Sequence, residues 1–265
     1  MARAFGILFG LATHLLFAWT VFRLFPFLQG TSHGLLTHGA ASTLQLPWFI
    51  LDALLAIQFA AVHSWLLLPM TRQRIERWLP SAFYGCFFCV ATCLNLLLAI
   101  EMWQRQNAVV WEFTGPWRWL IRIAFLACWP ALIYSLSLTG LGYQTGFTRW
   151  WAWVRRRKLA RRAFEVRGAY HFLRHPIYLS FLGLVWLTPA VTLDRALLIG
   201  LWTGYIFLGS YLKDRRLEFY LGESYRKYQA RVPGYPFFLI GPLAKVPTAP
   251  AESNPVPVAP RRIAA

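Results

Sequence analysis

Charged residues are scarce in this chain, and acidic residues are the scarcest of them. Asp, Glu, Lys and Arg make up only 14% of the 265 residues, and ten Asp and Glu stand against 27 Lys and Arg. A soluble globular domain usually has about a quarter charged residues. The hydrophobic fraction of 57% and the 14 Trp point the same way. The composition therefore excludes an ordinary soluble domain and predicts a polytopic membrane protein.

Cysteine is scarce as well, with four in the chain. Cys86, Cys89 and Cys93 recur at i, i+3 and i+7, on one face of a helix, and the first two have CxxC spacing. The surrounding segment is continuously apolar and has no histidine nearby. We therefore expect these cysteines to be small core residues, and the sequence predicts no metal site.

Long apolar runs make up most of the chain. A bilayer core of about 30 Å takes roughly 20 apolar residues per helix. Four segments are long enough, and two shorter ones follow them as a hairpin, the first interrupted by Pro189; the six are residues 5–28, 47–69, 81–102, 117–140, 177–193 and 196–212. The predicted fold class is an all-α polytopic membrane protein with about six transmembrane helices, a basic cytoplasmic arm and a C-terminal helical hairpin.

The chain divides into three parts on these patterns. Residues 1–145 form the predicted four-helix transmembrane scaffold, and residues 146–240 contain the arm, the hairpin and a polar block. Residues 241–265 are rich in Pro and Ala, which is typical of a disordered tail.

Basic residues predict the orientation in the membrane. Residues 30–46 contain no Lys or Arg, whereas the loop after the second helix has Arg72, Arg74 and Arg77, and residues 149–174 have nine basic residues against one acid. Because cytoplasmic loops are enriched in Lys and Arg, we expect both termini in the cytoplasm. Contact with anionic membrane lipids accounts for the net charge of +17, so no nucleic acid partner is expected. The sequence identifies no protein partner.

His63 is one of the few polar residues inside the apolar segments. Such residues are expensive in lipid and often functional. One interpretation is that His63 lines a substrate cavity, and the other is that it makes a hydrogen bond between helices.

The stretch from Arg174 to Tyr178 reads Arg-His-Pro-Ile-Tyr and opens the hairpin. Pro176 suits the first turn of a helix, which places His175 at a helix entrance. A helix N-terminus has unpaired N–H groups and partial positive charge, so together with Arg174 and His175 it can bind a carboxylate. Tyr170 and Tyr178 can add hydrogen bonds or stack on a purine. The alternative is simple anchoring to lipid headgroups.

A second polar block follows the hairpin, from Lys213 to Pro233. It contains Leu-Gly-Glu-x-Tyr-x-x-Tyr, ending at Tyr228, and then Arg-Val-Pro. Arg-His-Pro-x-Tyr, a hairpin of about 35 residues and this block together resemble the membrane-embedded methyltransferases of the isoprenylcysteine carboxyl methyltransferase superfamily. The chain looks most like the methanethiol S-methyltransferase branch, on matches that include His63-Ser64, residues 108–111, Gly146 with residues 150–155, and Pro189.

The resemblance implies an S-adenosylmethionine site between the arm and the hairpin. The residues that match family positions for the cofactor are Arg162, Ala163, Phe164, Glu165, Tyr170, His175, Pro176, Ile177 and Tyr178. Catalytic roles are expected for Asp214, Arg174 and His63. The expected reaction is S-methylation of a small thiol such as methanethiol, where a nearby cation from Lys213, Arg174 or His63 would favour the thiolate.

Lys213 departs from the family pattern, which has two adjacent acids where this chain has Lys213-Asp214. A lysine there would repel the ammonium and sulfonium groups of the cofactor. Asp214 or Glu218 are candidates to take over the role of the missing acid. The alternatives are a non-catalytic or ligand-binding membrane protein of the same fold, and a methyltransferase acting on a lipidated cysteine carboxylate or on a lipid.

Overall fold

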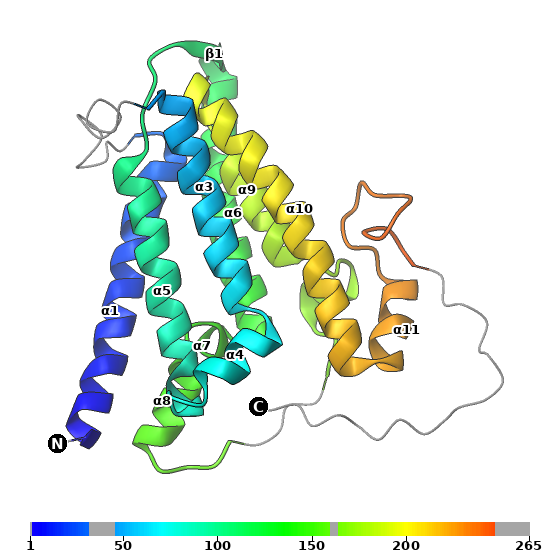
Figure 1. Ribbon diagram of the computed structural model, residues 1–265. Helices are drawn as coiled ribbons and strands as arrows, with labels where there is room; N and C mark the ends of the chain where they lie inside the picture. The colour runs from blue at the N-terminus through cyan, green and yellow to red at the C-terminus, as the bar shows by residue number, and fades with distance from the viewer. Residues whose placement is uncertain (1, 32–45, 160–163, 247–265) are drawn as a thin grey trace.

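A bundle of long helices makes up most of the molecule (Figure 1). The computed structural model describes residues 2–31, 46–159 and 164–246. Among them, five helices are long and apolar enough to cross a membrane: α1 (Ala2–Gln29), α3 (Trp48–Leu66), α5 (Ser81–Met102), α6 (Gly115–Thr139) and α10 (Leu193–Leu221). The apolar helix α9 (Pro176–Trp186) is shorter. The predicted class of an all-α polytopic membrane protein is confirmed.

The short elements gather at the two ends of the bundle (Figure 1). One end, which we call the arm end, has α4 (Pro69–Ile75), α7 (Leu141–Gln144) and α8 (Phe147–Val154). The opposite end, the strand end, has β1 (Val109–Glu112) and β2 (Ala190–Thr192). A 3-10 turn, η1 (Gly168–His171), precedes α9, and α11 (Glu223–Arg231) follows α10.

Helix lengths in the C-terminal hairpin differ from the prediction. The helix expected over residues 177–193 ends at Trp186, and its 11 residues rise only about 16 Å. Pro189 follows and lacks an N–H, and the chain there pairs as β2 instead of continuing the helix. In contrast, α10 runs nine residues beyond residue 212, so Lys213 and Asp214 lie inside a helix rather than in a block after it.

The two strands pair with each other at the strand end. β1 and β2 pair antiparallel, with Val109 opposite Thr192 and Glu112 opposite Ala190. Phe113 N donates to Pro189 O at 2.8 Å beside the ladder. This pairing ties the segment before α6 to the turn between α9 and α10.

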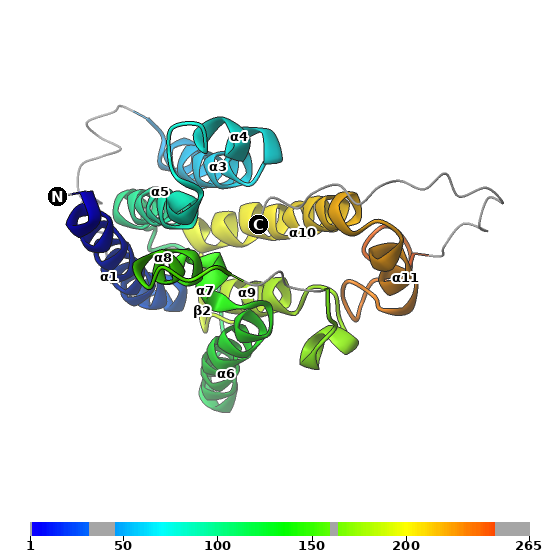
Figure 2. The same cartoon turned by 90° about the horizontal axis from the view of Figure 1, so that it is seen from below.

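The bundle packs inward on a shared apolar core and turns apolar side chains outward. Leu28, Ile100, Phe125, Leu184 and Leu198 from five different helices are buried together. Large apolar side chains on α1 and α6 face outward, as is typical of lipid contact, since lipid tails solvate them as well as a core would. Seen from below, α6 lies outside α9, and α10 extends away from α1 to meet α11 (Figure 2).

Two glycines allow α8 to pack closely against α5 at the arm end. Gly146, before α8, has a φ of +81°, and its Cα packs so tightly on Gly85 of α5 that a Cβ on Gly85 would lie 2.5 Å from it. Trp150 on α8 is then buried, and its Nε1 donates to Gly6 O at 2.9 Å. Trp150 thus packs against α1 and α5, because the two glycines let α8 approach α5 closely.

The start of the expected tail is packed. Leu243 and Ala244 are buried, and Gly234 N donates to Leu243 O at 2.8 Å. Residues 241–246 therefore join the folded part of the chain. The rest of the expected tail, residues 247–265, lies outside the described residues.

The glycine contact makes a prediction about stability. Gly146→Ala should destabilise the protein by about 1–3 kcal/mol, because the left-handed backbone is strained for alanine and the new Cβ would lie 2.3 Å from Cys86 N. The matched control is Gly200→Ala in α10, where a Cβ meets nothing within 4 Å. Thermal unfolding in detergent is the measurement, and an equal shift for both variants would contradict the close-contact argument.

Candidate functional site

Arg174 is the centre of a buried polar junction at the start of α9. Its side chain is fully buried and donates to Asp214 Oδ2 through Nε at 3.1 Å and through Nη2 at 2.9 Å. The remaining N–H groups reach four carbonyl oxygens, those of Gln229, Val232, Pro242 and Ala244. A guanidinium has five N–H donors, so these partners use its full capacity. We call this set the Arg174 junction.

Asp214 on α10 is the anion of the junction. Besides Arg174, its carboxylate accepts a hydrogen bond from Tyr225 OH at 2.5 Å and lies 3.1 Å from His175 Nε2. Burial and the Asp214 carboxylate raise the pKa of Tyr225, so the phenol stays protonated and donates. A buried carboxylate is stable only when paired and hydrogen-bonded in this way. The junction therefore joins α9, α10, α11 and the segment after α11.

His175 is buried beside this pair at the N-cap of α9. Its ring lies against Tyr178 and Tyr235, with centroids 5.6 and 5.5 Å away. Burial lowers the pKa of His175 and outweighs the nearby Asp214, so the imidazole is neutral. Its Nδ1 is buried with no hydrogen-bond partner among the described residues, and Nε2 likewise makes no well-directed hydrogen bond, although Asp214 Oδ2 lies 3.1 Å away. A buried polar atom without a partner is costly, which makes Nδ1 a candidate for a ligand contact.

Lys213 faces away from the junction toward two tyrosines. Its Nζ lies 5.4 Å from the ring centroid of Tyr178 and 5.7 Å from that of Tyr170. Within the part of the chain that the structure describes, the salt bridges of this region involve Asp214 and leave Lys213 without a carboxylate. An ammonium between aromatic faces is a cation–π arrangement. The pair Tyr170 and Tyr178 thus forms a place suited to a positive charge.

His63 lies on α3, near the arm end, among aromatic side chains. Its ring stacks on Phe59 at 5.7 Å and lies 5.1 Å from Phe88, while Nδ1 is 3.3 Å from Thr92 Oγ1. The neighbouring Ser64 is 3.3 Å from Tyr205 OH of α10. His63 thus makes the interhelical contact that was one of its two interpretations, within a mainly aromatic environment.

One face of α10 connects these two groups of residues. Tyr205, Gly209 and Lys213 follow one another at intervals of four, so they share a stripe of the helix. Tyr205 contacts Ser64, and Lys213 lies over Tyr178. Gly209 lies directly beside the ring of Tyr178, since a Cβ there would be 3.5 Å from Tyr178 Cε1. The stripe places the His63 group and the tyrosine pair along the same side of α10.

The other residues expected at a cofactor site are distributed differently. Phe164 packs on Tyr225 and Tyr228, with ring centroids 5.9 and 5.7 Å apart. Glu165 is exposed and pairs with Arg167. Pro176 and Ile177 form the first turn of α9, while Arg162 and Ala163 lie outside the described residues.

Sequence reasoning missed two tyrosines of this region. Tyr235 is fully buried against His175, and its hydroxyl lies 2.5 Å from Ser210 Oγ. Tyr205 was hidden in an apolar run. Tyr235 follows Arg-Val-Pro directly, so its place in that motif was the available signal; for Tyr205 there was none.

Curated relatives match the chain over most of its length. A methanethiol S-methyltransferase of a Pseudomonas species is 30% identical over 237 residues, which cover 86% of this chain and 88% of the relative. The chain belongs to the methanethiol S-methyltransferase family. Methanethiol S-methyltransferase 1 of Bradyrhizobium diazoefficiens is 28% identical over 233 residues, covering 86% of this chain and 80% of the relative.

A more distant relative is Nurim of Rattus norvegicus, 24% identical over 212 residues, which cover 72% of this chain and 78% of that protein. These relatives confirm the resemblance to the isoprenylcysteine carboxyl methyltransferase superfamily. No family model and no solved structure matches the chain.

The Arg174 junction predicts a large loss of stability when one partner is removed. Arg174→Ala should cost about 3–5 kcal/mol, because it leaves the Asp214 carboxylate buried and without its main counter-charge. Thermal unfolding followed by a thiol-reactive dye reports this directly, since Cys86, Cys89 and Cys93 are buried in the native protein.

The matched control is Arg226→Ala on α11. Arg226 pairs with Glu223 at 3.4 Å, with both side chains more than half exposed. Exposed pairs contribute about 0–1 kcal/mol. A similar loss of unfolding free energy in the two variants would show that the buried pair stabilises the protein no more than the exposed pair does.

The lowered pKa of His175 predicts a pH dependence. As the pH falls below the ordinary histidine pKa of 6.5, His175 of the unfolded chain takes up a proton that native His175 does not bind, so the free energy of unfolding falls. Above pH 6.5, His175 contributes no pH dependence to the free energy of unfolding. His175→Gln should reduce the slope of unfolding free energy between about pH 6.5 and 5. Equal slopes for wild type and variant, measured by urea unfolding, would refute a neutral His175.

Proposed function

We propose that the protein is an S-adenosylmethionine-dependent membrane methyltransferase that S-methylates a small thiol such as methanethiol. The observation that carries the proposal is the pair of Tyr170 and Tyr178, whose rings lie under the Lys213 ammonium. Beside this pair, Nδ1 of the buried His175 has no hydrogen-bond partner among the described residues. The names of the curated relatives support the reaction class. Five apolar helices support a membrane location, and the basic residues of the arm end favour the cytoplasm for that end.

The residues of this region fit the charged groups of S-adenosylmethionine. That cofactor has a sulfonium, for which the faces of Tyr170 and Tyr178 are suitable when the Lys213 ammonium, which lies over both rings in this structure, turns toward the carboxylate of the cofactor. It also has a carboxylate, for which the Lys213 ammonium is a partner, and polar groups that His175 Nδ1 can contact. We therefore assign Lys213 to the carboxylate of the cofactor, in place of the acid that family members present to its ammonium. Bound S-adenosylmethionine supplies a methyl group already activated by the sulfonium.

In this proposal Arg174 and Asp214 position the site rather than touch the reacting atoms. The hydrogen-bonding capacity of Arg174 is used by the junction, and Asp214 is surrounded there by Arg174, Tyr225 and His175. Their pairing sets the rotation of α10, which directs the preceding residue, Lys213, toward the tyrosine pair.

The acceptor would lie on the same side of α10, near His63, Ser64 and Tyr205. Phe59 and Phe88 make this environment apolar enough for a small thiol that partitions into lipid. The protein's task in methyl transfer is to align the acceptor sulfur with the methyl carbon and to exclude water. With Lys213 assigned to the carboxylate of the cofactor, His63 is the basic side chain beside this space that can take up the acceptor proton.

The deciding experiment measures both cofactor binding and methyl transfer in detergent-purified protein. We expect calorimetry to show binding of S-adenosylmethionine, and labelled methyl to appear in a volatile thioether when methanethiol is added. Lys213→Gln should weaken cofactor binding by roughly tenfold to a hundredfold, because a charge-assisted hydrogen bond of about 1.5–3 kcal/mol is lost. The control Lys227→Gln removes an exposed lysine of α11 and should bind like wild type.

A second candidate function follows from the same lysine. Lys213 occupies the tyrosine pair itself, and a site filled by the chain's own cation would suit a non-catalytic protein of this fold. The variant Lys213→Glu separates the two. No binding to wild type at millimolar cofactor, with binding gained in Lys213→Glu, would support the non-catalytic function and overturn the enzyme.

A further inference from the structure

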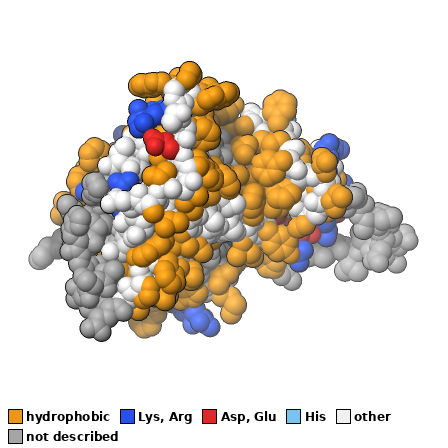
Figure 3. Space-filling model, turned by 90° about the horizontal axis from the view of Figure 1, so that it is seen from above, with side chains coloured by type: hydrophobic (Ala, Val, Ile, Leu, Met, Phe, Trp, Pro, Cys, Tyr) orange, Lys and Arg blue, Asp and Glu red, His pale blue; other side chains and the backbone are white. Residues whose placement is uncertain are grey.

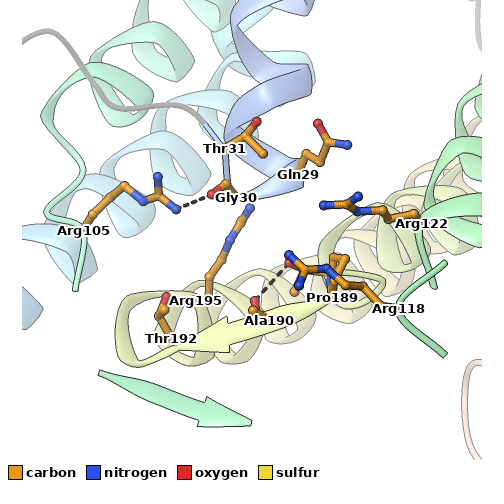
Figure 4. A pocket seen from close by; sticks show the side chains of 11 residues that line it. Gln29, Gly30, Thr31, Arg105, Arg118, Arg122, Pro189, Ala190, Thr192 and Arg195 are labelled. Carbon is orange, nitrogen blue, oxygen red and sulfur yellow. Dashed lines mark hydrogen bonds between the residues drawn. The ribbon is translucent and has the colours of Figure 1, made fainter. Parts of the chain in front are cut away.

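A cavity of about 130 Å³ opens at the strand end, far from the Arg174 junction along the bundle. It lies where the end of α1, the start of α6 and the turn between α9 and α10 meet (Figure 4). Four arginines line it: Arg105, Arg118, Arg122 and Arg195. The cavity is large enough for several water molecules or one small polyatomic anion.

The charge around the cavity is unbalanced. None of the described residues that line it is acidic. Of the acids nearby, Glu112 pairs with the exposed Arg118 at 3.2 Å. Asp194 accepts from Trp103 Nε1 at 3.2 Å and from Thr192 Oγ1 at 2.6 Å. The lining of the cavity is thus basic or uncharged, and Asp194 lies beside Arg195 in a smaller adjoining hollow.

Arg195 is a buried side chain of this cavity whose hydrogen bonding is incomplete. It is only 4% exposed, and its Nη2 donates to the carbonyl oxygens of Phe27 and Leu28 at the end of α1. Its Nη1 is buried with no partner among the described residues, and the same holds for Nε of Arg122. A buried guanidinium with an unused donor carries a large desolvation cost unless an anion or another acceptor meets it.

The surroundings distinguish this group from arginines that only contact lipid headgroups at the surface. Figure 3, seen from above, shows a mainly hydrophobic and uncharged face with a few basic patches. The donors come from separate elements: Arg195 from α10 and Arg122 from α6 both point into the space beside Pro189 (Figure 4). Such a convergence suits the several oxygens of one phosphate-type anion, which guanidinium groups bind in a bidentate manner.

We propose that the strand end contains an anion site in which Arg122 and Arg195 bind a phosphate-type oxyanion. The oxyanion is either free in solution or the phosphate of an anionic lipid headgroup. Trp117 and Trp119 on the first turns of α6 are exposed, and exposed Trp is typical of the ends of membrane-spanning helices, which favours a lipid as one source of the phosphate. The site is separate from the proposed methyltransferase site, and its occupant would clamp α1, α6 and the α9–α10 turn together.

The test measures thermal unfolding and bound lipid on delipidated, detergent-purified protein. One arm adds inorganic phosphate, with chloride at matched ionic strength as reference. The other adds phosphatidylglycerol, with phosphatidylcholine as reference, and counts retained lipid by native mass spectrometry. We expect phosphate or phosphatidylglycerol to raise the unfolding temperature, and the arm that does so identifies the source.

Variants connect that effect to the cavity. Arg122→Gln should weaken the apparent affinity by about tenfold, because one charge-assisted hydrogen bond is lost, while Arg122→Lys should lose less. Arg74→Gln, an exposed arginine of α4 at the arm end, is the matched control and should respond like wild type. Arg122 is partly exposed, so its replacement leaves the carbonyl contacts of Arg195 in place.

Two results would overturn the proposal. One is that neither phosphate nor phosphatidylglycerol raises the unfolding temperature of wild type above its reference. The other is that the rise persists undiminished in Arg122→Gln. Methyl transfer by Arg122→Gln should equal that of wild type, and this readout keeps the anion site distinct from the proposed function.

Discussion

The buried pair of Arg174 and Asp214 is the interaction on which the C-terminal half depends. Two charges removed from water are stable only with nearly complete hydrogen bonding. The chain supplies it from far apart in sequence: Tyr225 of α11 and the carbonyl oxygens of residues 229, 232, 242 and 244. Satisfying this one pair therefore orders α11 and the segment after it against α9 and α10.

The same pair determines the direction in which the neighbouring Lys213 points. Consecutive residues point about 100° apart around a helix. With Asp214 held in the junction, Lys213 must face the tyrosine pair. Asp214 therefore serves the fold, while the Lys213 ammonium lies over the rings of Tyr170 and Tyr178.

The two ends of the bundle use arginine in different ways. Arg174 at the arm end has every donor engaged within the chain. Arg195 at the strand end is equally buried but keeps a donor unused beside a cavity. The Arg174 arrangement stabilises the fold by itself. The Arg195 arrangement needs a further acceptor, which in our proposal is an anion. Amino-acid composition records both only as arginines of a membrane protein and does not show that their hydrogen bonding differs.

The sequence by itself determined the helical membrane class and the bounds of α5, because continuous apolar runs of bilayer length have few other folded forms. It also indicated the family, through the spacing of Arg-His-Pro-x-Tyr and the block ending in Arg-Val-Pro. Only the tertiary structure decided that α9 is short, that α10 extends through Lys213, and that Arg174 binds Asp214. The last of these outcomes rests on contacts between residues 40 to 70 positions apart, and local pattern carries no information on which distant partner will satisfy a buried charge.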